Sequence, residues 1–213
     1  MKSIFTLTAV FLLFTTGIIL AQENQNEFET IFKKKEGYKI SHGGYGAFNI
    51  GYTTIDGKSA MQIGGRGAWV VNHNIALGLA GNGFFNNLEK ANNPGEYYLA
   101  GGYGGFYFEP IVKPNSPIHI SFPILIGGGG VSTIPYNYKN ENYKDYTYNY
   151  DVFFVFEPAV EIEFNVVEFF RLSAGVSYRF TNGIILNYPF GQEISKDALN
   201  AFNFYLIFKF GKF

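Results

Sequence analysis

The sequence predicts an all-β protein: an eight-stranded antiparallel up-and-down transmembrane β-barrel with short periplasmic turns and longer extracellular loops. Three observations support this prediction. From Gly43 onward, apolar and polar residues alternate with a period of two in eight segments of about ten residues. The connections between these segments alternate between short and long. The first 21 residues have the layout of a secretory signal peptide.

The composition excludes several classes of protein. Charged residues make up 15% of the chain and aromatic residues 19%, whereas disordered chains combine high charge with few aromatics. The mean hydropathy of +0.02 does not fit a bundle of membrane helices. A formal net charge of −1 gives no electrostatic basis for binding nucleic acid. With no cysteine, the chain has no disulfide and no thiolate metal site. We expect no cofactor and no metal.

Residues 1–21 are expected to be removed after export. Met1-Lys2-Ser3 is a short basic start, Ile4–Leu20 is almost wholly apolar, and cleavage is expected after Ala21. The alternative is a retained membrane anchor, for which the apolar run is about long enough. Residues 22–40 are dense in charge and are expected to form an N-terminal periplasmic tail, with an interfacial helix or plug as the alternative. The barrel is then expected to span residues 41–213.

The eight expected strands each place large apolar residues on one face and small or polar residues on the other. They are Ser41–Thr54, Ala60–Val71, Ile75–Phe85, Glu96–Glu109, Pro117–Val131, Asp151–Phe164, Phe170–Phe180 and Ala201–Phe213. Pro123 and Pro158 interrupt the fifth and sixth strands and are expected to mark bulges, because proline removes a donor from the ladder. A secreted β-sandwich is the alternative fold. Small residues on the polar faces and Phe, Tyr and Ile on the apolar faces favour the barrel, with its narrow lumen and lipid-facing wall.

Loop lengths predict the orientation of the barrel. The short connections are Asn72–Asn74, Lys113–Ser116 and Val166–Glu168, and the longer ones are Asn86–Gly95, Ser132–Tyr150 and Asn182–Asp197, with a shorter member at Asp56–Ser59. Short turns are periplasmic in barrels of this kind. Both ends of the mature chain are therefore expected in the periplasm, together with His73, Lys113 and Val167. Aromatic girdles are expected from Trp69 and Phe210 on the inner side, and from Tyr52, Tyr97 and Tyr178 on the outer side.

The strand count, the loop asymmetry and the C-terminal strand Phe204–Phe213 together carry a resemblance to a known family. Residues Gly43–Phe213 resemble the small outer-membrane β-barrels, in the manner of the OmpA transmembrane domain and OmpX. The resemblance implies an outer-membrane location, contact with outer-membrane lipids and recognition of the C-terminal strand by the barrel assembly machinery. Phe213 is out of phase with the apolar row that ends at Phe210, so both are candidates for the recognised aromatic. We further expect a monomer.

The inward positions of the expected barrel carry charges of both signs. These residues are Arg66, Glu157, Glu161, Glu163, Arg171, Arg179 and Lys209. A turn centred on Val167 would place Glu163 opposite Arg171. Unpaired buried charge is costly, so these groups are expected to pair across the lumen and fill it. A charged gate or the lining of a narrow channel is the alternative.

The connection between Thr133 and Tyr150 is rich in Tyr and Asn, which suit adaptable contacts with a ligand. The candidate residues for surface recognition are Tyr136, Tyr138, Tyr143, Tyr146 and Tyr148. Anchoring of these rings among lipid headgroups is the alternative. The expected function is therefore a structural or surface-interaction role without enzymatic activity and with a mostly closed lumen. A narrow, porin-like passive channel for small or apolar solutes is the alternative.

Two patterns suggest other chemistry but fit it poorly. His119-Ile120-Ser121 has the His-x-Ser spacing of the outer-membrane lipid A deacylases, which act on the outer leaflet. The expected topology places this segment in the lumen near the periplasmic end, so lipid A modification is the less favoured function. The glycine clusters, such as Gly127–Gly130, lack the strand-then-helix setting and the Lys-Ser/Thr of phosphate loops. They are expected to give lumen space, bulges and kinks.

Overall fold

The computed structural model describes residues 40–86, 97–135, 149–186 and 194–213. The expected signal peptide and nearly all of the expected tail lie outside these ranges. The strands are β1 (His42–Ile55), β2 (Lys58–Val71), β3 (Ile75–Phe85), β4 (Tyr97–Val112), β5 (Ile118–Ser121), β6 (Ile124–Pro135), β7 (Tyr150–Val167), β8 (Phe170–Thr181) and β9 (Ala201–Lys212).

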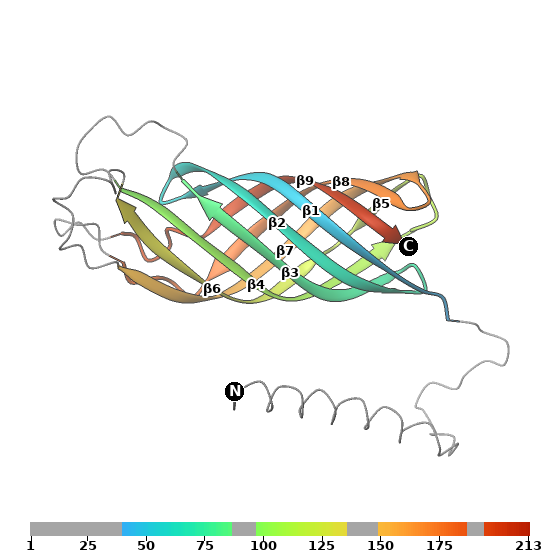
Figure 1. Ribbon diagram of the computed structural model, residues 1–213, viewed down its shortest axis with the longest axis horizontal. Helices are drawn as coiled ribbons and strands as arrows, with labels where there is room; N and C mark the ends of the chain where they lie inside the picture. The colour runs from blue at the N-terminus through green and yellow to red at the C-terminus, as the bar shows by residue number, and fades with distance from the viewer. Residues whose placement is uncertain (1–39, 87–96, 136–148, 187–193) are drawn as a thin grey trace, which may run out of the picture. The chain divides into compact units, whose positions relative to one another are not determined.

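The strands form a closed antiparallel barrel (Figure 1). Apart from β5 and β6, each strand pairs with its neighbour in sequence, and β9 pairs with β1 to close the ring. Strands β5 and β6 are two halves of one strand, since both lie between β4 and β7. The ring therefore passes through eight strand positions, and the predicted fold class is confirmed. In the described part of the chain, no helix is long and apolar enough to cross a membrane.

The two prolines interrupt pairing without shifting it, so the prediction of bulges at these positions was wrong. Strand β4 meets β5 and β6 in one continuous register, although Phe122 and Pro123 belong to neither half. The backbone N–H of Phe122 donates to the Pro110 carbonyl at 3.0 Å, and the Pro123 carbonyl accepts from the Ala159 N–H at 2.8 Å. The β7–β8 register is likewise the same on both sides of Pro158. The missing proline N–H thus removes one hydrogen bond between strands, but it does not insert the extra residue that defines a bulge.

The wall of the barrel has large apolar side chains outside and polar side chains inside. Leu79, Phe106 and Phe154 are more than half exposed on the outer face, whereas Glu163 and Lys209 inside are at most 1% exposed. In the described strands, the only charged residue at an outward position is Lys212, near the end of β9. Alternation along each strand produces this separation, because successive side chains point to opposite faces.

Glycines lie on both faces of the wall, so the expectation that they give space in the lumen holds for inward ones such as Gly64 and Gly175 but not for the rest. Gly65, Gly81, Gly104 and Gly128 are directly opposite one another across β2, β3, β4 and β6, on the outward face. Beside them, Gly83, Gly102 and Gly130 form a second outward row. We call these two rows the outer glycine band.

The end of the barrel opposite the chain's C-terminus is filled by apolar side chains. Residues 184–186 and 194–196, between β8 and β9, pair through backbone hydrogen bonds of 3.0 Å. The side chains of this connection that are buried among Leu99, Phe153 and other wall residues are Ile184, Leu186, Ile194, Ala198 and Leu199. We call these five residues the apolar plug. The sequence suggested an outward loop here, but its described flanks fold back into the mouth of the barrel. The shortest connection at this end is the Asp56-Gly57 turn, in which both residues have positive φ, of 51° and 72°.

Candidate functional site

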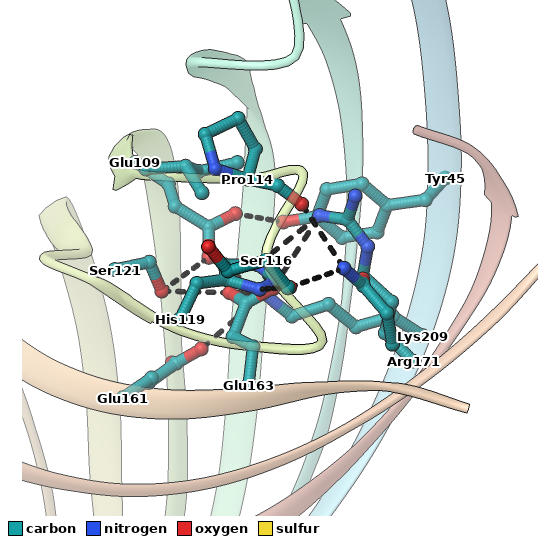
Figure 2. Close-up of polar contacts among 12 residues, drawn as sticks. Tyr45, Glu109, Pro114, Ser116, His119, Ser121, Glu161, Glu163, Arg171 and Lys209 are labelled. Carbon is teal, nitrogen blue, oxygen red and sulfur yellow. Dashed lines mark hydrogen bonds and ion pairs between the residues drawn. The ribbon is translucent and has the colours of Figure 1, made fainter. Parts of the chain in front are cut away.

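Strand register gathers the inward charges near the end of the barrel that holds the short turns. Glu163 of β7 is opposite His119 of β5, and Arg171 of β8 is opposite Lys209 of β9. Opposite residues on one face of a sheet have Cβ atoms about 5 Å apart. The result is one layer of contacting side chains, which we call the charge cluster: Arg66, Glu109, Glu161, Glu163, Arg171 and Lys209. Figure 2 labels the last five of these residues.

Lys209 is the centre of the charge cluster. Its Nζ lies 2.6 Å from Glu109 Oε1 and 3.4 Å from Glu161 Oε2, and it also donates to Glu163 Oε1. All four side chains are almost fully buried. An ammonium group has three donors, so one lysine can bridge carboxylates that come from β4 and β7. The positive charge of Lys209, in direct contact with all three carboxylates, thereby offsets their mutual repulsion.

Arg66 reaches across the lumen to the same carboxylates. Its two terminal nitrogens lie 2.9 and 2.7 Å from the two carboxylate oxygens of Glu161. Its guanidinium carbon is 4.8 Å from the centre of the Tyr107 ring, whose hydroxyl oxygen accepts from the same guanidinium. A bidentate pair fixes both distance and orientation, so β2 and β7 are tied together through the lumen.

The register between β7 and β8 differs from the expected one. Arg171 is opposite Asn165, and Glu163 is opposite Ser173, because the turn falls one residue later than Val167. The described pairing also shifts between Asn165 and Val167. Arg171 still lies 3.6 Å from Glu163, as a diagonal neighbour. Its guanidinium carbon is 4.0 Å from the centre of the Phe213 ring, which therefore lies over the lumen end and not in the outward row.

Neutral donors complete the charge cluster. Ser121 Oγ lies 2.7 Å from Glu163 and 3.0 Å from Glu109, and the Tyr45 hydroxyl donates to Glu109. The two ring nitrogens of His119 lie 3.2 Å from the Ser116 carbonyl oxygen and 3.1 Å from a Glu163 oxygen. Each of these groups satisfies a buried carboxylate, as buried charge requires.

Five of the seven inward charges named from the sequence belong to the charge cluster, and Glu157 and Arg179 lie outside it. Glu157 accepts from Ser177 at 2.5 Å and Asn203 at 2.9 Å, and no described cation lies within 4 Å of it. Arg179 donates from Nε to the Leu199 carbonyl at 2.7 Å and lies over the Phe84 and Tyr103 rings. Arg179 therefore supports the apolar plug.

Sequence reasoning missed Glu109, the fourth lumen carboxylate. With it, the lumen holds four carboxylates and four cations among its described residues: Glu109, Glu157, Glu161 and Glu163, with Arg66, Arg171, Arg179 and Lys209. The signal was present, because Glu109 follows Tyr103 and Tyr107 in phase on the inner face of β4. The expected strand ended at Glu109, whereas β4 continues to Val112.

Three of the carboxylates have oxygen atoms close enough to share a ligand. The carboxylate oxygens of Glu109, Glu161 and Glu163 lie within 4.8 Å of one another, which is the spacing of a metal site. The Lys209 ammonium already contacts all three, so it provides the positive charge that a metal would bring. The Tyr residues named for surface recognition, Tyr136 to Tyr148, lie outside the described residues.

Comparison with known proteins bears on the fold. The crystal structure of Neisserial surface protein A (NspA) matches with a TM-score of 0.55 at 8% sequence identity, over 83% of this chain and 100% of that chain. The chain has the fold of the small eight-stranded outer-membrane β-barrels. The N-terminal barrel domain of Pseudomonas aeruginosa OprF has a TM-score of 0.49 at 8% identity, over 78% of this chain and 96% of that chain. Ail, the attachment invasion locus protein of Yersinia pestis, has a TM-score of 0.48 at 9% identity, over 80% of this chain and 97% of that chain. No family model and no curated protein matches the sequence.

Proposed function

We propose that this chain is an integral outer-membrane protein whose barrel crosses the bilayer. The polarity of its wall is the observation that supports this most. Ile63, Leu79, Phe106 and Phe204 are each more than half exposed on the outer face, while the charged side chains pair inside. A soluble protein rarely exposes an apolar surface this continuous, whereas a bilayer requires one. The outer membrane is the location that the fold and the expected signal peptide both favour.

We propose that both chain ends and the short turns face the periplasm. Trp69 and Phe210, about half exposed at this end of the wall, would then form the inner aromatic girdle. Tyr52, at 46% exposure near the other end, would belong to the outer girdle with Tyr178. Tyr97 does not fit this girdle, because on β4 it is in phase with the inward residues Leu99 and Tyr103. The connections around Asn92, Tyr143 and Gln192 would face outward, together with the Asp56 turn.

The proposed role is structural or surface interaction, without enzymatic activity and with a closed lumen. The charge cluster occupies one end of the lumen and the apolar plug the other. His119 and Ser121 are both buried in the charge cluster and bound to Glu163, so they face neither lipid nor an open site. This arrangement suits a stabilising network better than general-base chemistry on a lipid. Tyr136, Tyr138, Tyr143, Tyr146 and Tyr148 remain the candidates for surface recognition.

Outer-membrane lipids and the barrel assembly machinery are the proposed partners of a monomeric barrel. Phe210 belongs to the outward row of β9, whereas the Phe213 ring lies over Arg171. This difference favours Phe210 as the aromatic that the assembly machinery reads. Phe210→Ala should then reduce the amount of assembled barrel in the membrane more than Phe213→Ala does. Equal losses would contradict this assignment.

Single cysteines test the orientation directly, because the chain contains none. Tyr143→Cys should react with a membrane-impermeant maleimide on intact cells. Asn115→Cys, in the exposed turn between β4 and β5, should react only after the outer membrane is permeabilised. The reverse pattern would overturn the orientation and would bring His119 to the outer leaflet.

Planar-bilayer recording separates the closed barrel from a narrow channel. Protein refolded and inserted into the bilayer should show no steady conductance, because charged pairs and apolar side chains block both ends of the lumen. Regular unitary conductance steps would contradict the closed lumen and support passive transport of small solutes.

A further inference from the structure

The middle of the lumen contains a small cavity between the charge cluster and the apolar plug. Its volume is about 40 Å³. One water molecule needs roughly 10–15 Å³ of free cavity volume, so the cavity has room for two or three water molecules. The polar side chains that line it include Asn49, Gln62, Arg66, Asn82 and Glu157, and the small ones include Ala47, Ala80 and Ala159.

Several polar atoms around this cavity have no partner within the protein. Gln62 is 1% exposed, and neither its amide nitrogen nor its amide oxygen has one. Glu157 is 6% exposed, and its Oε2 accepts no hydrogen bond of regular geometry, although the Tyr103 side chain interacts with this carboxylate. Asn49 Oδ1 and Arg66 Nε are two further buried atoms without a hydrogen-bond partner in the protein. A buried polar atom without a hydrogen bond is strongly disfavoured, so these atoms call for a ligand.

The kinds of atom present define the ligand. Gln62 Nε2 and Arg66 Nε are donors, whereas Gln62 Oε1, Asn49 Oδ1 and Glu157 Oε2 are acceptors. A bare cation would satisfy the acceptors but would face the donors and the Arg66 charge. An apolar molecule would satisfy neither. Water both donates and accepts, and it fits the volume.

We propose that Gln62, Glu157, Asn49 and Arg66 form an internal hydration site that binds two or three ordered water molecules. The site would allow Glu157 to remain in the lumen although no described cation lies within 4 Å of it. The proposal depends on the lumen alone and does not require the proposed membrane location or function.

Nuclear magnetic resonance can detect this water directly. In the barrel refolded in lipid nanodiscs, the side-chain amides of Gln62, Asn49 and Asn82 should show magnetisation transfer from water molecules with long residence times. Ala80→Val should abolish this transfer at Asn49 and Asn82, because the added methyl groups point into the cavity. Wild-type amides without water contacts would overturn the proposal.

The sign of a stability change provides an independent test. If the cavity binds water, Ala80→Val displaces it, leaves Gln62 unsatisfied and lowers the melting temperature in detergent by at least about 2 °C. If the cavity is dry, the same methyl groups fill a void and raise the melting temperature. Ala174→Val is the matched control, because Ala174 is exposed on the outer face of β8.

A second variant covers the case in which Ala80→Val does not fold. Gln62→Leu keeps the size of the side chain but removes the amide. At a hydrated site it loses water-mediated hydrogen bonds and should lower the melting temperature. At a dry site it removes an unsatisfied amide and should raise it. A rise in melting temperature with this variant would overturn the hydration site.

Discussion

The Lys209 ammonium group lies among three carboxylates, each fully buried. Replacing this lysine with methionine keeps the apolar stem but removes the charge. The carboxylates of Glu109, Glu161 and Glu163 would then repel one another without their central partner. Lys209→Met should lower the free energy of unfolding by about 3–5 kcal/mol, the usual cost of breaking a buried ion pair.

Lys212→Met is the matched control for this change. Lys212 is on the same strand, but it is exposed on the outward face, where a lost charge costs little. Urea titration in lipid vesicles, followed by the shift in gel migration between folded and unfolded barrel, measures both variants. Equal losses for the two lysines would show that the charge cluster does not stabilise the barrel.

Gly175 supports the charge cluster by leaving space for its neighbours. A Cβ at this position would lie 2.5 Å from Tyr205 Cε2 and 2.8 Å from Glu161 Cγ. The Tyr205 hydroxyl also donates to Glu161 at 3.2 Å, so the ring cannot move away without losing that bond. Gly175→Ala should therefore lower the free energy of unfolding by about 1–3 kcal/mol, as overpacking does.

Gly46 gives the comparison for Gly175, because a Cβ there meets no atom within 4 Å. Gly46→Ala adds the same methyl group to the outward face of β1 and should leave the thermal unfolding of the barrel in detergent nearly unchanged. A larger loss at Gly46 than at Gly175 would contradict the packing argument.

At the scale of strands and connections, periodicity predicts which residues face inward but not how far a strand extends or how its turn is formed. The alternation of β3 fixed its bounds at Ile75–Phe85. By contrast, the β7–β8 turn lies one residue later than expected, because residues 166–170 contain no Gly, Pro, Asn or Asp to mark its position. Glu109 is a different case, because it lay inside the expected strand and in phase with Tyr103 and Tyr107, so the alternation itself could have placed it in the lumen.

The apolar plug was also beyond local sequence reasoning. Ile184 and Leu186 belong to a three-residue apolar run that is too short to predict a strand, and Leu199 stands apart from it, so they read as parts of a loop. Their burial depends on the mouth of the barrel, which exists only once distant strands such as β4 and β7 have closed around it. Contacts of this kind are long-range by nature.

The apolar plug leads to a prediction at the same scale. Leu199 is 0% exposed and packs in the mouth of the barrel, whereas Ile185, in the same connection, is 77% exposed. Leu199→Ala should lower the free energy of unfolding by about 2–5 kcal/mol, since it leaves a cavity among buried side chains. Ile185→Ala should change it by less than about 0.5 kcal/mol. Similar losses for both would mean that the plug is not packed in the folded protein. Differential scanning calorimetry of the barrel in detergent measures the two changes.

For the molecule as a whole, Arg171 distinguishes a stabilising network from a gate. Arg171 contacts Glu163, His119 and the Phe213 ring at the short-turn end of the lumen. If the network is structural, Arg171→Ala should lower the melting temperature and leave the planar bilayer non-conducting. The charge cluster still blocks the lumen through Lys209 and Arg66 in that variant. Unchanged stability with new conductance would instead identify Arg171 as part of a gate.

Because of the outer glycine band, side chains extend outward from the wall to different distances around the circumference of the barrel. Strands β2, β3, β4 and β6 present bare backbone along the rows that include Gly81 and Gly104. Strands β7, β8 and β9 present Phe154, Phe180 and Phe204 at their outward positions. In a bilayer, acyl chains would approach the main chain closely along the glycine rows and would be held away where Phe106 and the aromatic rings of β7, β8 and β9 project. The outer radius of the barrel would therefore be smaller along the glycine rows, and the shell of lipids around it would be asymmetric.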